Sequence, residues 1–250
     1  MLLCVDIGNT NITFGLFEGN KFVKEFRLQS DIMLSQIKYE NKLKEIFTDY
    51  KITKLIMASV VDELTEKFAL ALENVFSIKP LIVTPRTKAG ITIIADNIDE
   101  VGTDRIANAA AVAGEYNKAV IVIDFGTATT FDIVNSKKEF CGGIIIPGVK
   151  TQLHALFQAT SKLPEFSVDE SPTVLGQNTK DAIMAGVIRG CACAIDGLID
   201  QCEEALGENA ILVATGGLSS LISGYMKHKI DKTNPILTLE GLKKIYEMNM

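Results

Sequence analysis

Two aspartates end matching stretches of the chain. Asp6 closes one apolar run and is followed by Gly8, while Asp124 closes a second apolar run and is followed by Gly126. Ligands of α/β proteins bind at the ends of strands, so two such carboxylates could hold Mg²⁺ and phosphate oxygens between them. An aspartate that merely begins a turn is the common alternative. Two copies in matching contexts favour the binding interpretation.

The turns after these aspartates have the composition of a phosphate site. Glycine permits close backbone approach, and consecutive turn N–H groups can cradle phosphate oxygens without a lysine. Hydroxyl and amide side chains stand beside them, namely Asn9, Thr10, Thr127 and Thr129. Neither turn matches G-x-x-x-x-G-K-[ST], which argues against a P-loop enzyme.

Two further segments carry candidate chemistry. Gly216-Gly217 follows an apolar run and could lie flat against an adenine or a ribose, although such a pair is often only a turn. Asp104-Arg105 opens a predicted helix, whose dipole favours the ionised carboxylate. With a pKa near the ordinary value of about 3.9, Asp104 could accept a proton from a substrate hydroxyl. Arg105 could bind a substrate carboxylate, and the alternative is a helix-start aspartate beside a surface arginine.

The elements that must position these residues form a repeat. The sequence predicts strand, turn, strand, turn and strand over residues 2–28, and the same order over residues 119–146. Alternation of strands with helices indicates the α/β class, and the repeat indicates two similar domains, residues 1–115 and 116–250. Helices are expected at about 34–50, 62–76, 103–116, 149–160, 179–206 and 239–249, the last capped by Thr238.

Three glycines interrupt the predicted helix over residues 179–206, at Gly186, Gly190 and Gly197. Glycine inside a helix costs stability, so these positions indicate close approach of another element. That element is either part of the same monomer or a second subunit, and the sequence leaves both open.

Composition, net charge and cysteine content limit which classes of protein the chain can belong to. The chain has 250 residues, of which 47% are hydrophobic and 22% charged, as in a globular protein. A net charge of −6 without a basic run argues against nucleic-acid binding. No uninterrupted apolar run approaches the roughly 18–20 residues that span a bilayer, and no signal peptide is evident. Five cysteines without a C-x-x-C pair favour reduced thiols over a zinc site. A cytoplasmic protein without a membrane partner is expected.

Taken together, the motifs resemble those of type III pantothenate kinases along nearly the entire chain. The resemblance rests on Asp6-x-Gly8-Asn9-Thr10, Gly102-x-Asp104-Arg105, Asp124-Phe125-Gly126-Thr127, Gly176-Gln177-Asn178-Thr179, Ala214-Thr215-Gly216-Gly217 and Leu239-Glu240-Gly241-Leu242. It implies the duplicated actin-like, ribonuclease H-like ATPase fold, with two similar domains around a nucleotide cleft. It also implies transfer of the ATP γ-phosphoryl group to pantothenate, which gives 4'-phosphopantothenate in the first step of coenzyme A biosynthesis.

The resemblance further implies a homodimer that needs Mg²⁺ and a monovalent cation, K⁺ or NH₄⁺. It assigns ATP binding to Asp6, Ile7, Gly8, Asn9, Thr10, Asn11, Ile12, Thr13 and Thr127. It assigns pantothenate binding to Gly102, Thr103, Asp104, Arg105 and Thr179, the last from the other subunit, with Asp104 as general base. Asp124 would bind the monovalent cation, and Asp6 is a candidate ligand of Mg²⁺.

Two positions depart from the family pattern. Thr103 stands where the family usually has alanine, and Ala95 stands where it commonly has a tyrosine that lines the pantothenate site. Two alternatives therefore stay open: a kinase of another small carboxylate-bearing alcohol, and a non-catalytic regulatory relative. A regulator is expected to have lost one of Asp6, Asp104 and Asp124, and all three are present.

Overall fold

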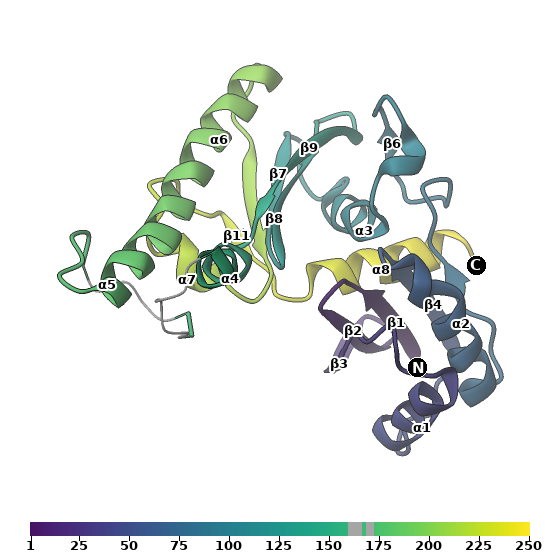
Figure 1. Ribbon diagram of the computed structural model, residues 1–250. Coiled ribbons are helices and arrows are strands. Elements are labelled where there is room, and N and C mark those ends of the chain that lie inside the picture. The colour runs from purple at the N-terminus through teal and green to yellow at the C-terminus, as the bar shows by residue number, and fades with distance from the viewer. Residues whose placement is uncertain (160–166, 169–172) are drawn as a thin grey trace. The chain divides into compact units, whose positions relative to one another are not determined.

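The computed structural model describes residues 1–159, 167–168 and 173–250 (Figure 1). The chain forms two compact units, Met1–Ala113 with Ile236–Met250, and Gly114–Pro235. This division differs from the expected boundary at 115/116, because the last helix returns to the first unit. That helix, α8 (Leu237–Met248), buries Leu239, Leu242 and Ile245 there.

The sheet of the first unit has the order β3-β2-β1-β4-β5. Strands β1 (Leu2–Ile7), β2 (Asn11–Glu18) and β3 (Lys21–Gln29) are antiparallel neighbours, whereas β4 (Lys54–Ser59) runs parallel to β1 and β5 (Leu81–Ile82) runs parallel to β4. In this register Asp6 lies opposite Thr13 of β2 and Ala58 of β4. Asp6 therefore stands at the carboxyl edge of the parallel pair.

Helices cover both faces of this sheet. On one face, α1 (Gln36–Ile46) and α2 (Asp62–Phe76) enclose a core that includes Val5, Phe14, Tyr39 and Phe68. On the other face lie α3 (Thr103–Val112) and α8, which contact β4 and β1 (Figure 1). Strand β6 (Thr92–Ile93) and a 3₁₀ turn (Ile98–Glu100) precede α3.

Helix α8 packs closely on α3. A Cβ atom at Gly241 would overlap the carbonyl oxygen of Ala107. The hydroxyl of Thr238 donates to Oδ1 of Asn108 at 2.8 Å, and Nζ of Lys244 donates to the carbonyl of Ala111. The expectation that Thr238 caps the last helix is wrong, since α8 begins at Leu237 and the hydroxyl binds α3 instead.

The second unit repeats the order of strands and turns found in the first unit. Its sheet contains the order β11-β10-β7-β8-β9, with β7 (Val120–Phe125), β8 (Ala128–Val134) and β9 (Glu139–Pro147) antiparallel. Strands β10 (Ile211–Thr215) and β11 (Lys232–Thr233) add in parallel. The predicted α/β duplication is confirmed. The first turns of the two units differ in length. Residues 8–11 link the paired residues Ile7 and Ile12, whereas residues 126–128 link the paired residues Phe125 and Thr129.

Helices α4 (Val149–Ala159), α5 (Thr179–Met184), α6 (Gly190–Leu206) and α7 (Ser219–Ser223) belong to the second unit. A π-helical turn, Ala185–Arg189, joins α5 to α6, so the helix predicted over 179–206 is continuous but locally widened. The predicted end of α4 at residue 160 lies outside the described residues. Cβ atoms at Gly186, Gly190 and Gly197 would meet nothing within 4 Å in the described part of the chain. These glycines therefore do not serve close packing within that part.

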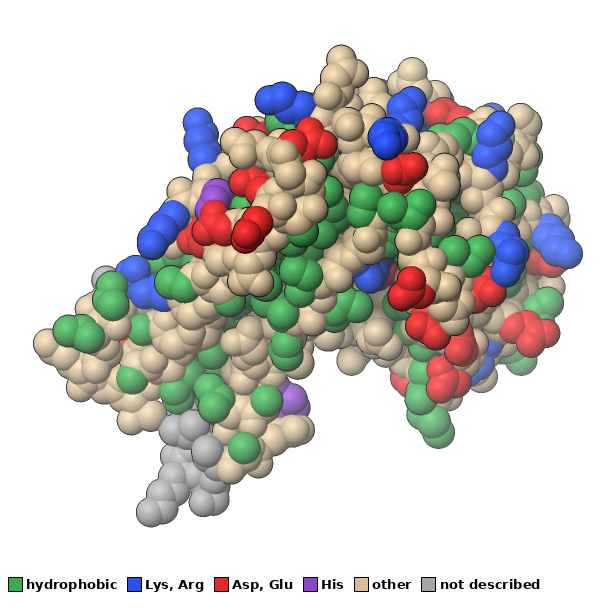
Figure 2. Space-filling model, turned by 90° about the horizontal axis from the view of Figure 1, so that it is seen from above, with side chains coloured by type: hydrophobic (Ala, Val, Ile, Leu, Met, Phe, Trp, Pro, Cys, Tyr) green, Lys and Arg blue, Asp and Glu red, His purple; other side chains and the backbone are tan. Residues whose placement is uncertain are grey.

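The α5–α6 helix also has the length and composition of a membrane span. Its most apolar window has a mean hydropathy of 1.7, and 44% of that window is buried inside the protein. Core helices of soluble proteins have the same properties. On the face shown in Figure 2, acidic and basic side chains are interspersed.

A buried aspartate fastens the loop before β11 to α6. Asp196 accepts hydrogen bonds from the backbone N–H groups of Lys227 and His228 at 2.8 and 2.9 Å, and Nδ1 of His228 lies 3.1 Å from it. Burial raises the pKa of Asp196, but the bonds from His228 and Lys227 outweigh that effect, so its pKa is lowered overall.

We expect Asp196→Asn to destabilise the protein by about 1.5–3 kcal/mol, the usual value of hydrogen bonds to a charged group. The wild-type contribution is present above the ordinary pKa of aspartate and disappears as pH falls through the lowered folded-state pKa, so the two proteins should converge in strong acid. Urea unfolding at neutral and acidic pH measures this. Asp200→Asn is the control, because Asp200 contacts Nε2 of His228 from an exposed position and should matter little. Equal losses from both variants would contradict the assignment.

Candidate active site

The turn between β1 and β2 is exposed but tightly held. The N–H of Gly8 donates to the carbonyl of Asn11 at 3.0 Å. Ser30, which follows β3, donates its hydroxyl to the carbonyl of Gly8 at 2.5 Å and its N–H to the carbonyl of Thr10 at 3.0 Å. A fixed turn with accessible backbone suits an anion site. Ser30 could not be predicted from the sequence, because no local signal connects the end of β3 to this turn.

The residues assigned to ATP by resemblance differ in what they can offer. The side chains of Ile7 and Ile12 are fully buried in the core, so only their backbone atoms can contact a ligand. Side chains of Asn9, Thr10 and Asn11 are exposed. Asp6 is half-buried at the end of β1, and its Oδ1 atom is shielded from solvent.

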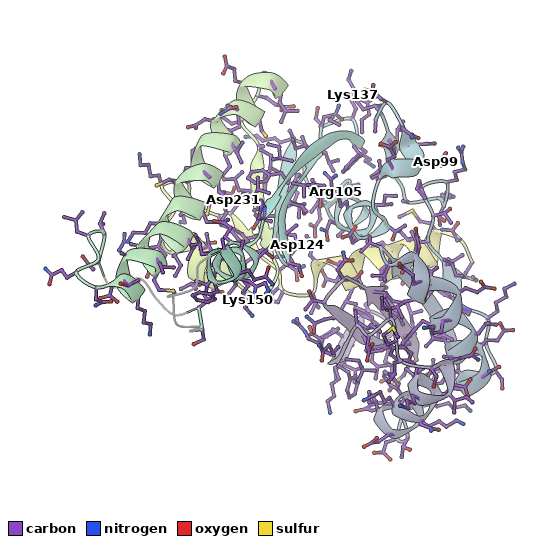
Figure 3. All side chains as sticks on the ribbon, in the orientation of Figure 1. Asp99, Arg105, Asp124, Lys137, Lys150 and Asp231 are labelled. Carbon is purple, nitrogen blue, oxygen red and sulfur yellow. The ribbon has the colours of Figure 1, made fainter. Side chains whose placement is uncertain are left out.

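Asp104 lies in the first turn of α3, two residues after the N-cap residue Gly102. A Cβ atom at Gly102 would come within 2.6 Å of Oδ1 of Asp104. The carboxylate of Asp104 can therefore lie in this position only because residue 102 is glycine. The backbone N–H of Arg105 donates to the same oxygen at 2.8 Å. The structure thus brings Gly102, Asp104 and Arg105 into one helix start in the first unit, where Figure 3 shows Arg105 on α3.

Burial dominates the electrostatics of Asp104. Desolvation raises its pKa, while the backbone N–H and the charge of Arg105 lower it by less, so its pKa lies above the ordinary value. The expectation of an ordinary pKa at a helix start is wrong, because sequence cannot show how much solvent the fold removes. A raised pKa makes the carboxylate a stronger base.

Thr103 points away from the solvent-accessible side of the site. It is 8% exposed, and its hydroxyl accepts from the N–H of Ser59 at 3.1 Å and donates to the carbonyl of Ser59 at 2.9 Å. Ser59 is the last residue of β4 and lies opposite Ile7 of β1. The start of α3 is therefore attached to the sheet edge that carries Asp6. The role of Ser59 could not be predicted from the sequence, because Ser59 and Thr103 are 44 residues apart in the chain.

The position of the missing family tyrosine lies between β6 and the 3₁₀ turn. Ala95 is half-buried there, and its neighbour Ile94 is 51% exposed. Arg86 and Asp99 form an ion pair at 2.9 Å in the same region, and Figure 3 labels Asp99.

In the second unit, Asp124 is the next-to-last residue of β7 (Figure 3) and lies opposite Thr130 of β8. Gly216 follows β10 with φ +86, and a Cβ atom there would come within 2.5 Å of Oδ1 of Asp124 and 2.6 Å of the backbone nitrogen of Phe125. Only glycine therefore allows these two turns to meet. The neighbouring Gly217 is exposed, as a flat ligand surface requires.

The turn over residues 126–128 is also held from outside. The carbonyl of Thr127 accepts from the N–H of Gly148 at 3.0 Å and from the hydroxyl of Thr151 at 2.6 Å, which leaves the Thr127 side chain exposed. Thr179 is exposed at the start of α5, after the N-cap residue Asn178. Among the residues that the structure describes, no group of three or more His, Cys, Asp or Glu side chains could hold a metal ion.

Two matching strand–turn–strand units, each with an aspartate at the end of its first strand, define the actin-like class of ATPases and kinases. The family model for type III pantothenate kinases matches residues 2–201. A type III pantothenate kinase of Myxococcus xanthus is 38% identical over 256 residues, covering 100% of this chain and 99% of that protein. The chain therefore belongs to the type III pantothenate kinase family, and it is a kinase.

Solved structures agree on the fold. A Baf family transcriptional activator from Campylobacter jejuni superimposes with a TM-score of 0.63 at 24% identity, covering 99% of this chain and 98% of that one. An inorganic polyphosphate/ATP-glucomannokinase from Arthrobacter gives a TM-score of 0.52 at 11% identity, covering 99% and 97%. At these identities the likeness concerns the fold alone.

Proposed function

We propose that the chain transfers the γ-phosphoryl group of ATP to the terminal hydroxyl of pantothenate, with Asp104 as the general base. The observation that carries this proposal is the shielded, raised-pKa carboxylate of Asp104 beside Arg105, in a member of this family. Arg105 binds the substrate carboxylate, and Gly102 lets the substrate approach the helix start. The Thr103 backbone and Thr179 complete the substrate contacts.

The proposed chemistry needs little covalent participation from the protein. The substrate hydroxyl oxygen forms the new bond to the γ-phosphorus while the bond to the ADP oxygen breaks, and Asp104 takes the hydroxyl proton. Catalysis then consists mainly of positioning and charge neutralisation. Asp104 is half-buried, so its carboxylate loses less hydration when the substrate arrives than an exposed carboxylate would.

ATP and cations are assigned from the two turns. In the first unit, the turn from Asp6 to Thr13 binds ATP phosphates through its backbone and exposed side chains. In the second unit, Thr127 contacts ATP and Asp124 binds K⁺ or NH₄⁺. A single carboxylate such as Asp6 fits Mg²⁺, which keeps several waters and phosphate oxygens as its other ligands. When bound, Mg²⁺ neutralises phosphate charge.

ADP release from ATP and Mg²⁺, with and without pantothenate and in K⁺ versus Na⁺, tests the proposal. Pantothenate-dependent, K⁺-stimulated release is expected, and it would show that Ala95 replaces the usual tyrosine without loss of the activity. ATP binding without pantothenate-dependent release would refute it. That outcome would favour either another carboxylate-bearing alcohol or a regulatory role.

We infer that the active form is a cytoplasmic homodimer that acts on small molecules rather than on nucleic acid. All five cysteines are free thiols, which agrees with a reducing compartment. Gly186, Gly190, Cys193 and Ala194 form an exposed stripe of small residues on one helix, where a second copy could approach closely. Thr179 begins that same helix, which supports a contribution of Thr179 to the substrate site of the partner subunit.

Gly190→Arg is expected to shift the protein toward monomers, because a long charged side chain would stand on this stripe. The monomer fold should survive, since a Cβ atom at Gly190 meets nothing within 4 Å in the described part of the chain. Sedimentation equilibrium measures the change. Glu66→Arg, on the exposed face of α2, is the control and should leave the association unchanged. If Gly190→Arg remains dimeric, the subunit interface does not include this stripe of small residues.

A further inference from the structure

Ser59 connects three elements of the first unit at the edge of its sheet. Its backbone ends β4, and both its N–H and its carbonyl bind the single hydroxyl of Thr103 in α3. A hydroxyl has one donor and two acceptor positions, so one Thr103 side chain can satisfy both groups of one residue. This arrangement attaches the first turn of α3 to β4 at two points.

The side chain of Ser59 extends the connection to α2. Its Oγ atom accepts from the N–H of Val61, the N-cap residue of α2, at 3.2 Å. It also accepts from the hydroxyl of Thr65, one turn into α2, at 2.8 Å. The three groups Thr103, Ser59 and Thr65 thus form one partly buried network that holds α2 and α3 to the same strand end.

The start of α3 depends on this network. Its N-cap residue, Gly102, has no side chain that could cap the helix, and Asp104 itself accepts the N–H of Arg105 in the first turn. A helix start leaves backbone N–H groups without intrahelical partners and frays easily. Thr103 is the residue directly before Asp104, so its attachment to Ser59 restrains the backbone from which the carboxylate of Asp104 projects.

We propose that Thr103 is a positioning residue for the transfer reaction: its hydroxyl holds Asp104 against the sheet edge by binding both backbone groups of Ser59. This inference rests on the proposed function, because it assigns Thr103 a role through Asp104.

Three variants test the inference. Thr103→Val keeps the shape but removes the hydroxyl and should lower kcat about 10- to 100-fold, the effect of a small misplacement of a catalytic group. The KM for ATP should stay unchanged, because the turn over residues 8–11 is held by Ser30 instead. Thr103→Ser should restore kcat close to wild type. Thr238→Val is the matched control, since it removes a hydroxyl bond to α3 at Asn108, beyond Asp104, and should leave kcat unchanged.

The outcomes separate this inference from the proposed function. Wild-type turnover with pantothenate tests the function alone. If the wild type is active and Thr103→Val matches its kcat, or if Thr238→Val loses as much, the positioning role of Thr103 is refuted while the function stands. If the wild type has no pantothenate-dependent turnover, the function and the catalytic part of the inference both fail. Amide hydrogen exchange then tests the hydrogen bond from the N–H of Ser59 to the hydroxyl of Thr103. If this bond forms, the Ser59 amide exchanges faster in Thr103→Val, which lacks the hydroxyl, than in Thr103→Ser, which keeps it.

Discussion

Replacing Asp104 by asparagine is expected to lower kcat by about 10²- to 10⁴-fold, the usual contribution of a general base. The amide cannot accept the hydroxyl proton, yet it keeps the size of the carboxyl group and can still receive the N–H of Arg105. ATP binding should be unchanged, because the ATP-binding turns lie elsewhere in the chain. Steady-state kinetics together with calorimetric titration of ATP measure both quantities. Full activity in this variant would show that another group removes the proton.

Thermal stability provides the control for Asp104→Asn. Burial holds the pKa of Asp104 above its ordinary value, so ionising this group costs the folded state free energy at neutral pH. Asparagine carries no charge and removes that cost. The variant should therefore melt at the same temperature as wild type or higher. A melting temperature that fell to the assay temperature would mean that the loss of activity reflects unfolding.

The same raised pKa predicts the pH dependence of wild-type turnover. Asp104 must be ionised to accept a proton, so kcat/KM should fall as pH drops through its pKa. Because that pKa lies above the ordinary aspartate value, the acid limb should appear at a higher pH than an exposed aspartate would give. Asp104→Asn should abolish this limb in its residual activity.

Gly241→Ala is expected to destabilise the first unit and to lower turnover together. Its Cβ atom would overlap the carbonyl oxygen of Ala107 across the α3–α8 contact. The atom it would meet belongs to the backbone of Ala107 and cannot rotate away as a side chain can, so α3 and α8 must separate. Such overpacking lowers the free energy of unfolding by about 1–3 kcal/mol or more. Ala107 lies one turn after Asp104, so kcat should fall as well. Urea unfolding and steady-state kinetics measure the two effects.

Gly197→Ala is the matched control for this substitution. It is also a glycine inside a helix, but its Cβ atom would meet nothing within 4 Å of the described protein. Alanine is the better helix former, so this variant should gain roughly 0.5–1 kcal/mol. If both variants change stability in the same direction and by similar amounts, the close α3–α8 contact does not restrict position 241.

Much of the fold follows from local patterns. The two runs that end in Asp6 and Asp124, and the turns after them, predicted the paired strand–turn–strand units that the structure contains. Period-two and period-3.6 patterns are local properties, so they can be recognised before any long-range contact is known. The expected boundary at 115/116 could not include α8 in the first unit. That placement depends on how Leu239 fits against Gly15 of β2 and Gly241 against Ala107 of α3, which are distant in sequence.

The candidate site likewise has features that follow from the sequence and features that only the tertiary structure determines. By itself, the sequence determined the residue types that could carry phosphoryl transfer, namely Asp6, Asp104-Arg105 and Asp124 with the glycines that follow strands. Only the tertiary structure decided the raised pKa of Asp104, the attachment of Thr103 to Ser59 and the contact of Gly216 with Asp124. Desolvation and hydrogen bonding depend on every atom that surrounds a group. Those atoms come from segments whose separation in the chain carries no sign of their closeness in space.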